Sequence, residues 1–104
     1  MAFHLPIEAP ATGVVAAYWR ITHVQMDCAA RALDVQLHGH RDAEARKAGR
    51  APAHRLAFRF DLGAMEEPGR ISLAELYRAV RAAPAGTDPE GAPLPPLFRD
   101  AADI

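Results

Sequence analysis

The first strand-forming run of the chain changes its hydrophobic alternation partway along. Trp19 and Ile21 occupy one parity, and Val24 and Met26 occupy the other, so a regular strand would expose one of these pairs to solvent. A β-bulge near Thr22-His23 would return both pairs to the same face. The run therefore predicts a bulged strand in a sheet with one buried face.

We expect this bulged strand to span residues 14–26 and two further strands to follow it. Residues 32–40 alternate, with Leu33, Val35 and Leu37 on one face, and the short connection 27–31 predicts an antiparallel hairpin. Residues 54–62 have the most regular alternation in the chain. Their inward positions are Leu56, Phe58, Phe60 and Leu62. Between these strands, residues 41–52 predict a polar loop in which Asp42 and Arg46, at i, i+4, allow one helical turn.

A helix is expected from about residue 73 to residue 83. Ser72 and Glu75 have the spacing of a capping box, and Pro84 cannot continue a helix. The predicted apolar stripe consists of Leu73, Leu76, Tyr77 and Val80, and the predicted water-facing residues are Glu75, Arg78 and Arg81. This stripe gives the helix one face to pack on the sheet.

These elements predict an α+β domain over residues 14–83. It is an antiparallel three-stranded β-meander with one C-terminal helix packed on the sheet and flexible termini. We expect residues 1–13 to form an N-terminal arm that is extended or loosely docked, and residues 84–104 to form a Pro-rich acidic tail. The predicted core cluster is Trp19, Ile21, Val35, Leu37, Phe58, Phe60, Leu73, Leu76 and Val80.

Nothing in the sequence assembles a recognisable catalytic or metal site. His38 and His40 share one strand face, and His23 and His54 lie on neighbouring strands, but no Cys or carboxylate spacing completes a ligand set. Cys28 is the single cysteine and lies in a predicted turn without a neighbouring base. We therefore expect no enzymatic activity, no catalytic residue, no metal and no cofactor. No apolar run approaches the ~20 residues of a membrane span, so we expect a soluble protein without membrane contact.

Charge is unevenly distributed along the chain although the formal net charge is only -1. Residues 41–59 form a basic segment, and residues 60–104 are acidic. The basic residues of the segment are Arg41, Arg46, Lys47, Arg50, Arg55 and Arg59, and its acidic residues are Asp42 and Glu44. This polarity suits contact between copies or with partners, or a weak nucleic-acid surface; a plain solvated surface is the third interpretation. Against nucleic acid stand the near-neutral total charge and the lack of exposed aromatic residues for base stacking.

Several of these features occur together in one known family. They are Tyr18-Trp19-Arg20-Ile21, then Val24 and Asp27, then Val35-Gln36-Leu37-His38-Gly39-His40, then Asp42, Ala45-Arg46, Gly49 and Pro52, and then the strand with Phe58 and Phe60. In this order they resemble a family of small proteins encoded among the tail genes of tailed phages and prophages. The likeness covers roughly residues 14–60. The chain departs from the family at His40, where an aromatic is more usual, and in its long acidic Pro-rich end.

The resemblance implies a prophage-encoded structural or assembly protein of the virion, in the tail or tail tip, acting by protein-protein contact. The expected partners are other phage tail proteins, with a second copy of the protein itself as the other option, in the bacterial cytoplasm during assembly and then in the virion. The alternative is a small nucleic-acid-binding or regulatory factor that uses the basic segment 41–59. We expect the interaction residues to be Arg41, Arg46, Lys47, Arg50, Leu94, Leu97 and Phe98. The last three dock either on the sheet of this domain or on a partner.

Overall fold

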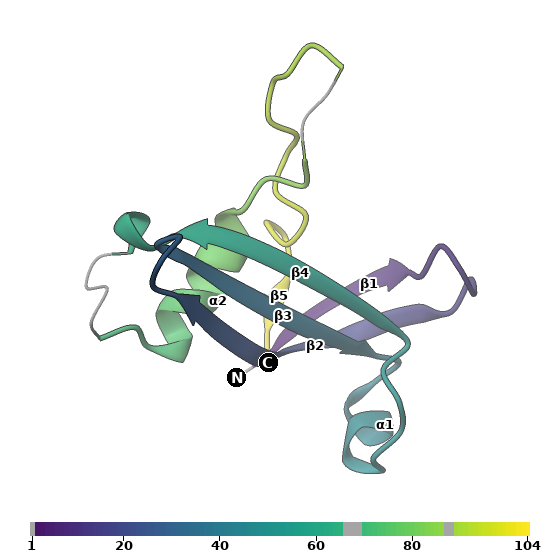
Figure 1. The fold of residues 1–104 in the computed structure, drawn as a ribbon. Helices are drawn as coiled ribbons and strands as arrows, with labels where there is room; N and C mark the ends of the chain where they lie inside the picture. The colour runs from purple at the N-terminus through teal and green to yellow at the C-terminus, as the bar shows by residue number, and fades with distance from the viewer. Residues whose placement is uncertain (1, 66–69, 87–88) are drawn as a thin grey trace.

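The computed structural model describes residues 2–65, 70–86 and 89–104, and its centre is a five-stranded antiparallel sheet in the order β4-β3-β2-β1-β5 (Figure 1). The strands are β1 (Phe3–Glu8), β2 (Val15–Asp27), β3 (Ala32–His40), β4 (His54–Asp61) and β5 (Ala102–Asp103). The helices are α1 (Ala43–Lys47) and α2 (Leu73–Ala82), and a short 3-10 helix, η1, spans Leu62–Ala64. Helix α2 lies across one face of the sheet, while α1 lies at one end of it (Figure 1).

The predicted three-stranded meander with a single helix is wrong, because the sheet also includes β1 and β5 and the chain forms a second, short helix. Strand β1 comes from residues expected to form a loose arm. Pro6 favoured that interpretation, since proline cannot donate to a strand ladder. In the structure the β1–β2 register shifts between His4 and Ile7, so Pro6 occupies an irregular stretch where the missing donor is tolerated.

The C-terminal segment returns to the sheet. Strand β5 pairs with Phe3 and His4 of β1, and the backbones of Ala2 and Ile104 exchange two hydrogen bonds. Phe98 is fully buried, so of the two alternatives for this side chain, docking on the domain itself is the one observed. Residues 87–88 of the predicted tail lie outside the described residues.

The predicted bulge is confirmed at Thr22. The β2–β3 register runs from Ile21 opposite Leu37 to His23 opposite Gln36, which leaves Thr22 as the extra residue. Its hydroxyl donates to the Gln36 carbonyl oxygen at 3.3 Å. Beyond the bulge, Val24 lies opposite Val35 and Met26 lies opposite Leu33, so both side chains share the face of the core. They are nevertheless about half exposed, because β1 pairs with β2 only between Val15 and Trp19.

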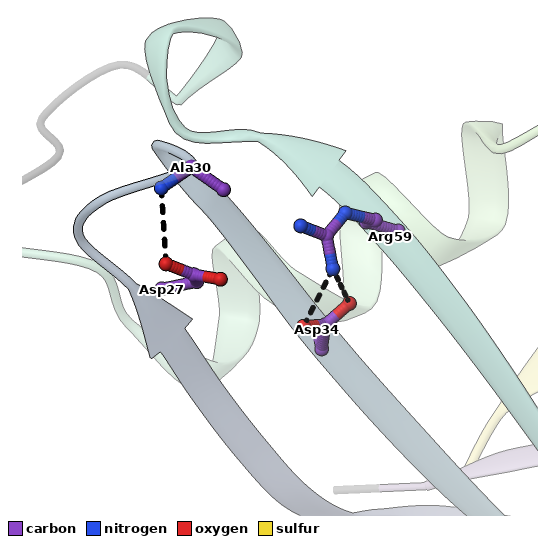
Figure 2. Close-up of polar contacts among 4 residues, drawn as sticks. All are labelled: Asp27, Ala30, Asp34 and Arg59. Carbon is purple, nitrogen blue, oxygen red and sulfur yellow. Dashed lines mark hydrogen bonds and ion pairs between the residues drawn. The ribbon is translucent and has the colours of Figure 1, made fainter.

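Strands β3 and β4 and the hairpin between β2 and β3 agree with the sequence prediction. The Asp27 carboxylate accepts the Ala30 amide in the hairpin turn, and Arg31 adopts a left-handed conformation with φ 53° (Figure 2). On the outer face of the sheet, Arg59 of β4 forms a two-pronged ion pair with Asp34 of β3, with both N–O distances at 3.0 Å (Figure 2). Both side chains are largely exposed, so this pair contributes little to stability.

Helix α2 begins as predicted, with the Ser72 hydroxyl accepting the Glu75 amide at 3.2 Å. Leu76, Tyr77 and Val80 are buried, but Leu73 is exposed and does not belong to the core. Arg81, expected to face water, is instead directed to the C-terminal segment. Its guanidinium donates to the Ala101 carbonyl and the Asp103 carboxylate, and it lies 4.9 Å from the centre of the Phe3 ring. This helix therefore holds both termini in place.

Aromatic side chains form the centre of the core. Phe98 stacks on Phe3 at 5.3 Å between ring centres and meets Trp19 edge-on at 5.6 Å. The Trp19 indole donates to the carbonyl oxygens of Leu5 and Ala16 and so ties β1 to β2. Phe58 and Phe60, predicted to be central, are only partly buried and pack on the margin of this cluster. Their remaining exposure marks the side of the core that opens to solvent.

Candidate functional site

A groove of about 770 Å³ lies between the edge strand β4 and helix α2. Strand β4 contributes its inward side chains, and α2 contributes the small residues of its C-terminal half. The apolar wall from the strand is Leu56, Phe58 and Phe60, and the helix side includes Ala79 and Ala82. Because alanines face the phenylalanines, the strand and helix leave space that neither fills.

The far side of the groove is formed by the chain as it leaves α2. Residues 83–86 and Leu97 line this side, and the backbone of Leu94 donates to the Gly86 carbonyl at 2.9 Å. Pro84 and Pro96 form an isolated antiparallel bridge that holds the two limbs of this loop together. Phe98, directly after Leu97, anchors the returning limb in the core. The groove therefore has two walls on regular elements and a third that is pinned by a buried aromatic.

Strand β4 is a terminal strand of the sheet, and among the described residues no strand pairs with its outer side. Its alternate residues are half-buried toward the groove and exposed on the opposite face. The polar groups at the groove are few: Arg59, which is paired with Asp34, and Glu75 and Arg78 of α2. An open strand edge beside an apolar hollow is the arrangement to which an extended peptide can add as a further strand.

The basic residues expected to mediate contact lie far from this groove. Arg41, Arg46, Lys47 and Arg50 are all exposed on α1 and its flanks, at the opposite end of the molecule from residues 84–86 and 89–96 (Figure 1). Asp42 caps α1 by accepting the Ala45 amide at 2.8 Å, which fixes the helical turn that the sequence allowed. Two of these basic residues, Arg41 and Arg50, line a separate hollow that also contains Asp42 and Glu44.

The tail residues of the predicted site divide between core and groove. Leu97 lines the groove and is 38% exposed, and Leu94, which is 39% exposed, lies on the same loop. Phe98 is buried and is not accessible to a partner. The structure thus places Leu94 and Leu97 in the same returning segment, of which only Leu97 lines the groove, and separates both from the basic residues. Sequence reasoning missed the main part of the groove, although the alanines of α2 opposite large strand residues were a visible signal.

The histidines do not form a metal centre in the part of the chain that the structure describes, where no three His, Cys, Asp or Glu side chains lie close enough to hold an ion. His23 and His38 lie 5.6 Å apart between ring centres on the outer face, whereas His54 contacts Trp19. Burial lowers the pKa of His38, and the positive charge of Arg55 and the neighbouring rings of His23 and His40 lower it further. The free thiol of Cys28 is exposed.

None of the family models, curated proteins or solved structures compared with this chain matches it. Within the described residues, no helix is long and apolar enough to cross a membrane. The site's own geometry therefore carries the functional argument.

Proposed function

We propose that this protein acts by protein-protein contact, and that the groove between β4 and α2 binds an extended segment of a partner. The observation that carries this proposal is the combination of an open strand edge with an apolar hollow directly beside it. The edge offers backbone hydrogen bonds to any extended peptide, and the hollow selects for apolar side chains at alternate positions. No reaction is required of the site.

The groove favours a partner segment with medium-sized apolar side chains. The rings of Phe58 and Phe60 are stacked, with 9° between their planes and 6.3 Å between their centres, and both side chains line the hollow. On the helix side of the groove, the short side chains of Ala79 and Ala82 leave space for a partner side chain. Arg78, exposed at the margin, suits an acidic residue flanking the apolar part of the partner.

The kind of partner we propose is based on the resemblance of residues 14–60 to small proteins encoded among phage tail genes. We propose a prophage-encoded structural or assembly role in the virion tail or tail tip, with neighbouring tail proteins as the source of the extended segment. Contacts of this kind suit assembly, because a partner strand that adds to the sheet is fixed in both register and direction.

The test is co-purification of the full chain with the products of the genes that flank its own. Ala82→Arg inserts a long cationic side chain into the groove from an exposed helix position, and Ala11→Arg makes the same change at an exposed turn position outside it. We expect the wild type and Ala11→Arg to retain a partner and Ala82→Arg to lose it. Equal retention by all three proteins would contradict the proposal.

The alternative role, a nucleic-acid-binding or regulatory factor, makes a different prediction. It would depend on the basic segment and not on the groove, and its affinity would fall steeply with salt as counterions are released. A mobility-shift titration at low and high salt, with wild type and Ala82→Arg, separates the two roles. Salt-sensitive binding that Ala82→Arg leaves unchanged would favour the alternative.

A further inference from the structure

We infer that the extended segment bound beside β4 carries an acidic side chain directly after its apolar residues, opposite Arg55. The inference rests on the proposed function of the groove and adds to it a charge requirement from the outer face of the sheet. Arg55 does not line the groove. It is the strand residue that selects the charge of the partner on this face.

The hydrogen bonding of β4 shows which of its residues meet a partner strand. The Leu62 amide donates to the Arg31 carbonyl at 2.9 Å, directly beyond the end of β4. Because hydrogen-bonded pairs alternate along an antiparallel ladder, every second residue back from Leu62 turns its backbone N–H and C=O toward β3. The residues between them, which are Arg55, Ala57 and Arg59, turn theirs to the open edge. A partner strand therefore bonds to these three residues, and its side chains opposite them lie on the outer face of the sheet.

The two arginines on this face of β4 differ in their charge balance. Arg59 is neutralised by the two-pronged ion pair with Asp34, on the face turned away from α2 (Figure 2). Arg55 is exposed and forms no ion pair with any residue that the structure describes. The unbalanced charge at the open edge is therefore that of Arg55.

The neighbours of Arg55 add positive charge and supply no counterion. Arg55 lies opposite His38 of β3, and His38 lies opposite Arg20 of β2, so the three form one row across the sheet. Burial, and then the charge of Arg55, lower the pKa of His38. The carboxylates of these three strands lie toward the other end of the sheet; they are Asp27, Asp34 and Asp61. An acidic side chain on the next strand would balance the row, whereas a basic one would be repelled.

The direction of the partner strand fixes where the acidic residue falls in its sequence. All the strand pairs of this sheet are antiparallel, and antiparallel ladders are slightly more stable per residue than parallel ones. A partner antiparallel to β4 passes Phe60 first, then Phe58 and Leu56, and then Arg55. Its apolar residues therefore occupy alternate positions, and the acidic residue follows the last of them immediately.

Selection from a random peptide library displayed on yeast, with the full chain as the target, tests this requirement. We expect the wild type to enrich alternating apolar peptides with Asp or Glu directly after the last apolar position. Arg55→Glu should keep the apolar pattern and replace the acid with Lys or Arg, because like charges directly opposite each other are destabilising. Arg41→Glu is the matched control, since it makes the same change of charge at an exposed position outside β4 and the groove, and it should select as the wild type does.

The selection separates failure of this inference from failure of the proposed function. If the wild type enriches no alternating apolar peptide that Ala82→Arg fails to enrich, the groove is not a peptide site and the inference fails with it. If the apolar pattern is enriched without an acidic preference, or with one that Arg55→Glu leaves unchanged, the groove stands and the charge requirement is overturned.

Fluorescence anisotropy with the most enriched peptide, and with a version in which its acidic residue is replaced by Lys, measures the size of the preference. The wild type should bind the acidic version on the order of tenfold more tightly, and Arg55→Glu should reverse this order. Arg55→Gln, which removes the charge without reversing it, should bind the two versions with similar affinity. Equal affinity of the wild type for the two versions would overturn the inference.

Discussion

At the scale of single residues, Gly39 is the position at which a small change has the largest local consequence. It lies opposite Trp19 in the β2–β3 ladder, and a Cβ atom placed on it would lie 2.6 Å from the Trp19 ring. The ring is fully buried and bonded through its indole nitrogen, so it has no room to withdraw. In the sequence, His38 and His40 were the residues considered for a site, whereas in the structure it is Gly39, between them, that packs against Trp19.

We therefore expect Gly39→Ala to lower the free energy of unfolding by about 1–3 kcal/mol, the usual cost of overpacking a core. The measurement is urea denaturation followed by tryptophan fluorescence, which reports on Trp19 directly. Gly49→Ala is a useful comparison. It has open space around the added methyl group but a φ of 72°, so its cost comes from the backbone alone. Wild-type stability of Gly39→Ala would show that Trp19 can move.

His38 gives the protein a pH dependence of known sign. Burial, Arg55, His23 and His40 lower its pKa from the ordinary value of 6.5, and Arg20 lies opposite it on β2. Because the unfolded chain takes up this proton before the folded chain does, the stabilisation is present above pH 6.5 and is lost as the pH falls through the lowered pKa.

We expect His38→Gln to reduce the loss of thermal stability between neutral and mildly acidic pH. Arg55→Gln should have a smaller effect in the same direction, because it removes one of the positive charges that disfavour protonation. Melting temperatures measured across this pH range test both variants. An unchanged pH profile for His38→Gln would assign the dependence to other groups.

At the scale of elements, the C-terminal segment is part of the folded domain. Phe98 contacts the rings of Phe3, Trp19 and Phe58, and Arg81 of α2 holds the backbone of the residues that follow. Removing the C-terminal segment from residue 89 onward would therefore open the core, so the predicted tail is not a dispensable extension of the domain.

Truncation of Phe98 to Ala should lower the free energy of unfolding by about 3–5 kcal/mol, the range for large aromatic residues in cores. Leu94→Ala, on the exposed part of the same segment, should cost far less. Chemical denaturation of the two variants compares these costs. A midpoint for Phe98→Ala equal to that of the wild type would show that the segment is only loosely attached.

The same elements show what local sequence can and cannot predict. Strands β2, β3 and β4, the bulge and the start of α2 follow from alternation and capping, which depend on neighbouring residues. Strand β5 has only two residues and carries no periodic signal. It forms because Phe98 and Arg81 position the chain beside β1, and such long-range contacts are not visible in a window of sequence.

The exposure of individual side chains was harder to predict than the type of element they belong to, because exposure also depends on long-range contacts. Leu73 lies on the predicted apolar stripe of α2, yet it is exposed, and the buried part of the stripe begins only at Leu76. Phe58 and Phe60 alternate regularly, but β4 lies at the sheet margin, where the apolar residues that α2 presents to them are the small Ala79 and Ala82. The candidate groove results from this incomplete cover, which depends on where α2 crosses the sheet.

At the scale of the whole molecule, the basic surface and the apolar groove lie in different regions. The basic residues of α1 and its flanks lie at one end, and the groove lies beside β4 and α2 (Figure 1). Charges at a distance mainly accelerate association, whereas buried contacts mainly slow dissociation. If a tail partner binds in the groove, the two regions should affect different rate constants.

The charge reversals Arg46→Glu, Lys47→Glu and Arg50→Glu, made together, should leave the fold intact because all three side chains are exposed. We expect this triple variant to slow association with an acidic partner at low salt, and to match the wild type at high salt, where screening removes the difference. Ala82→Arg should instead accelerate dissociation at both salt concentrations. Surface plasmon resonance with a co-purified partner measures both rates. Faster dissociation of the triple variant with unchanged association would mean that the partner contacts α1 directly, and the groove would then not be the main binding site.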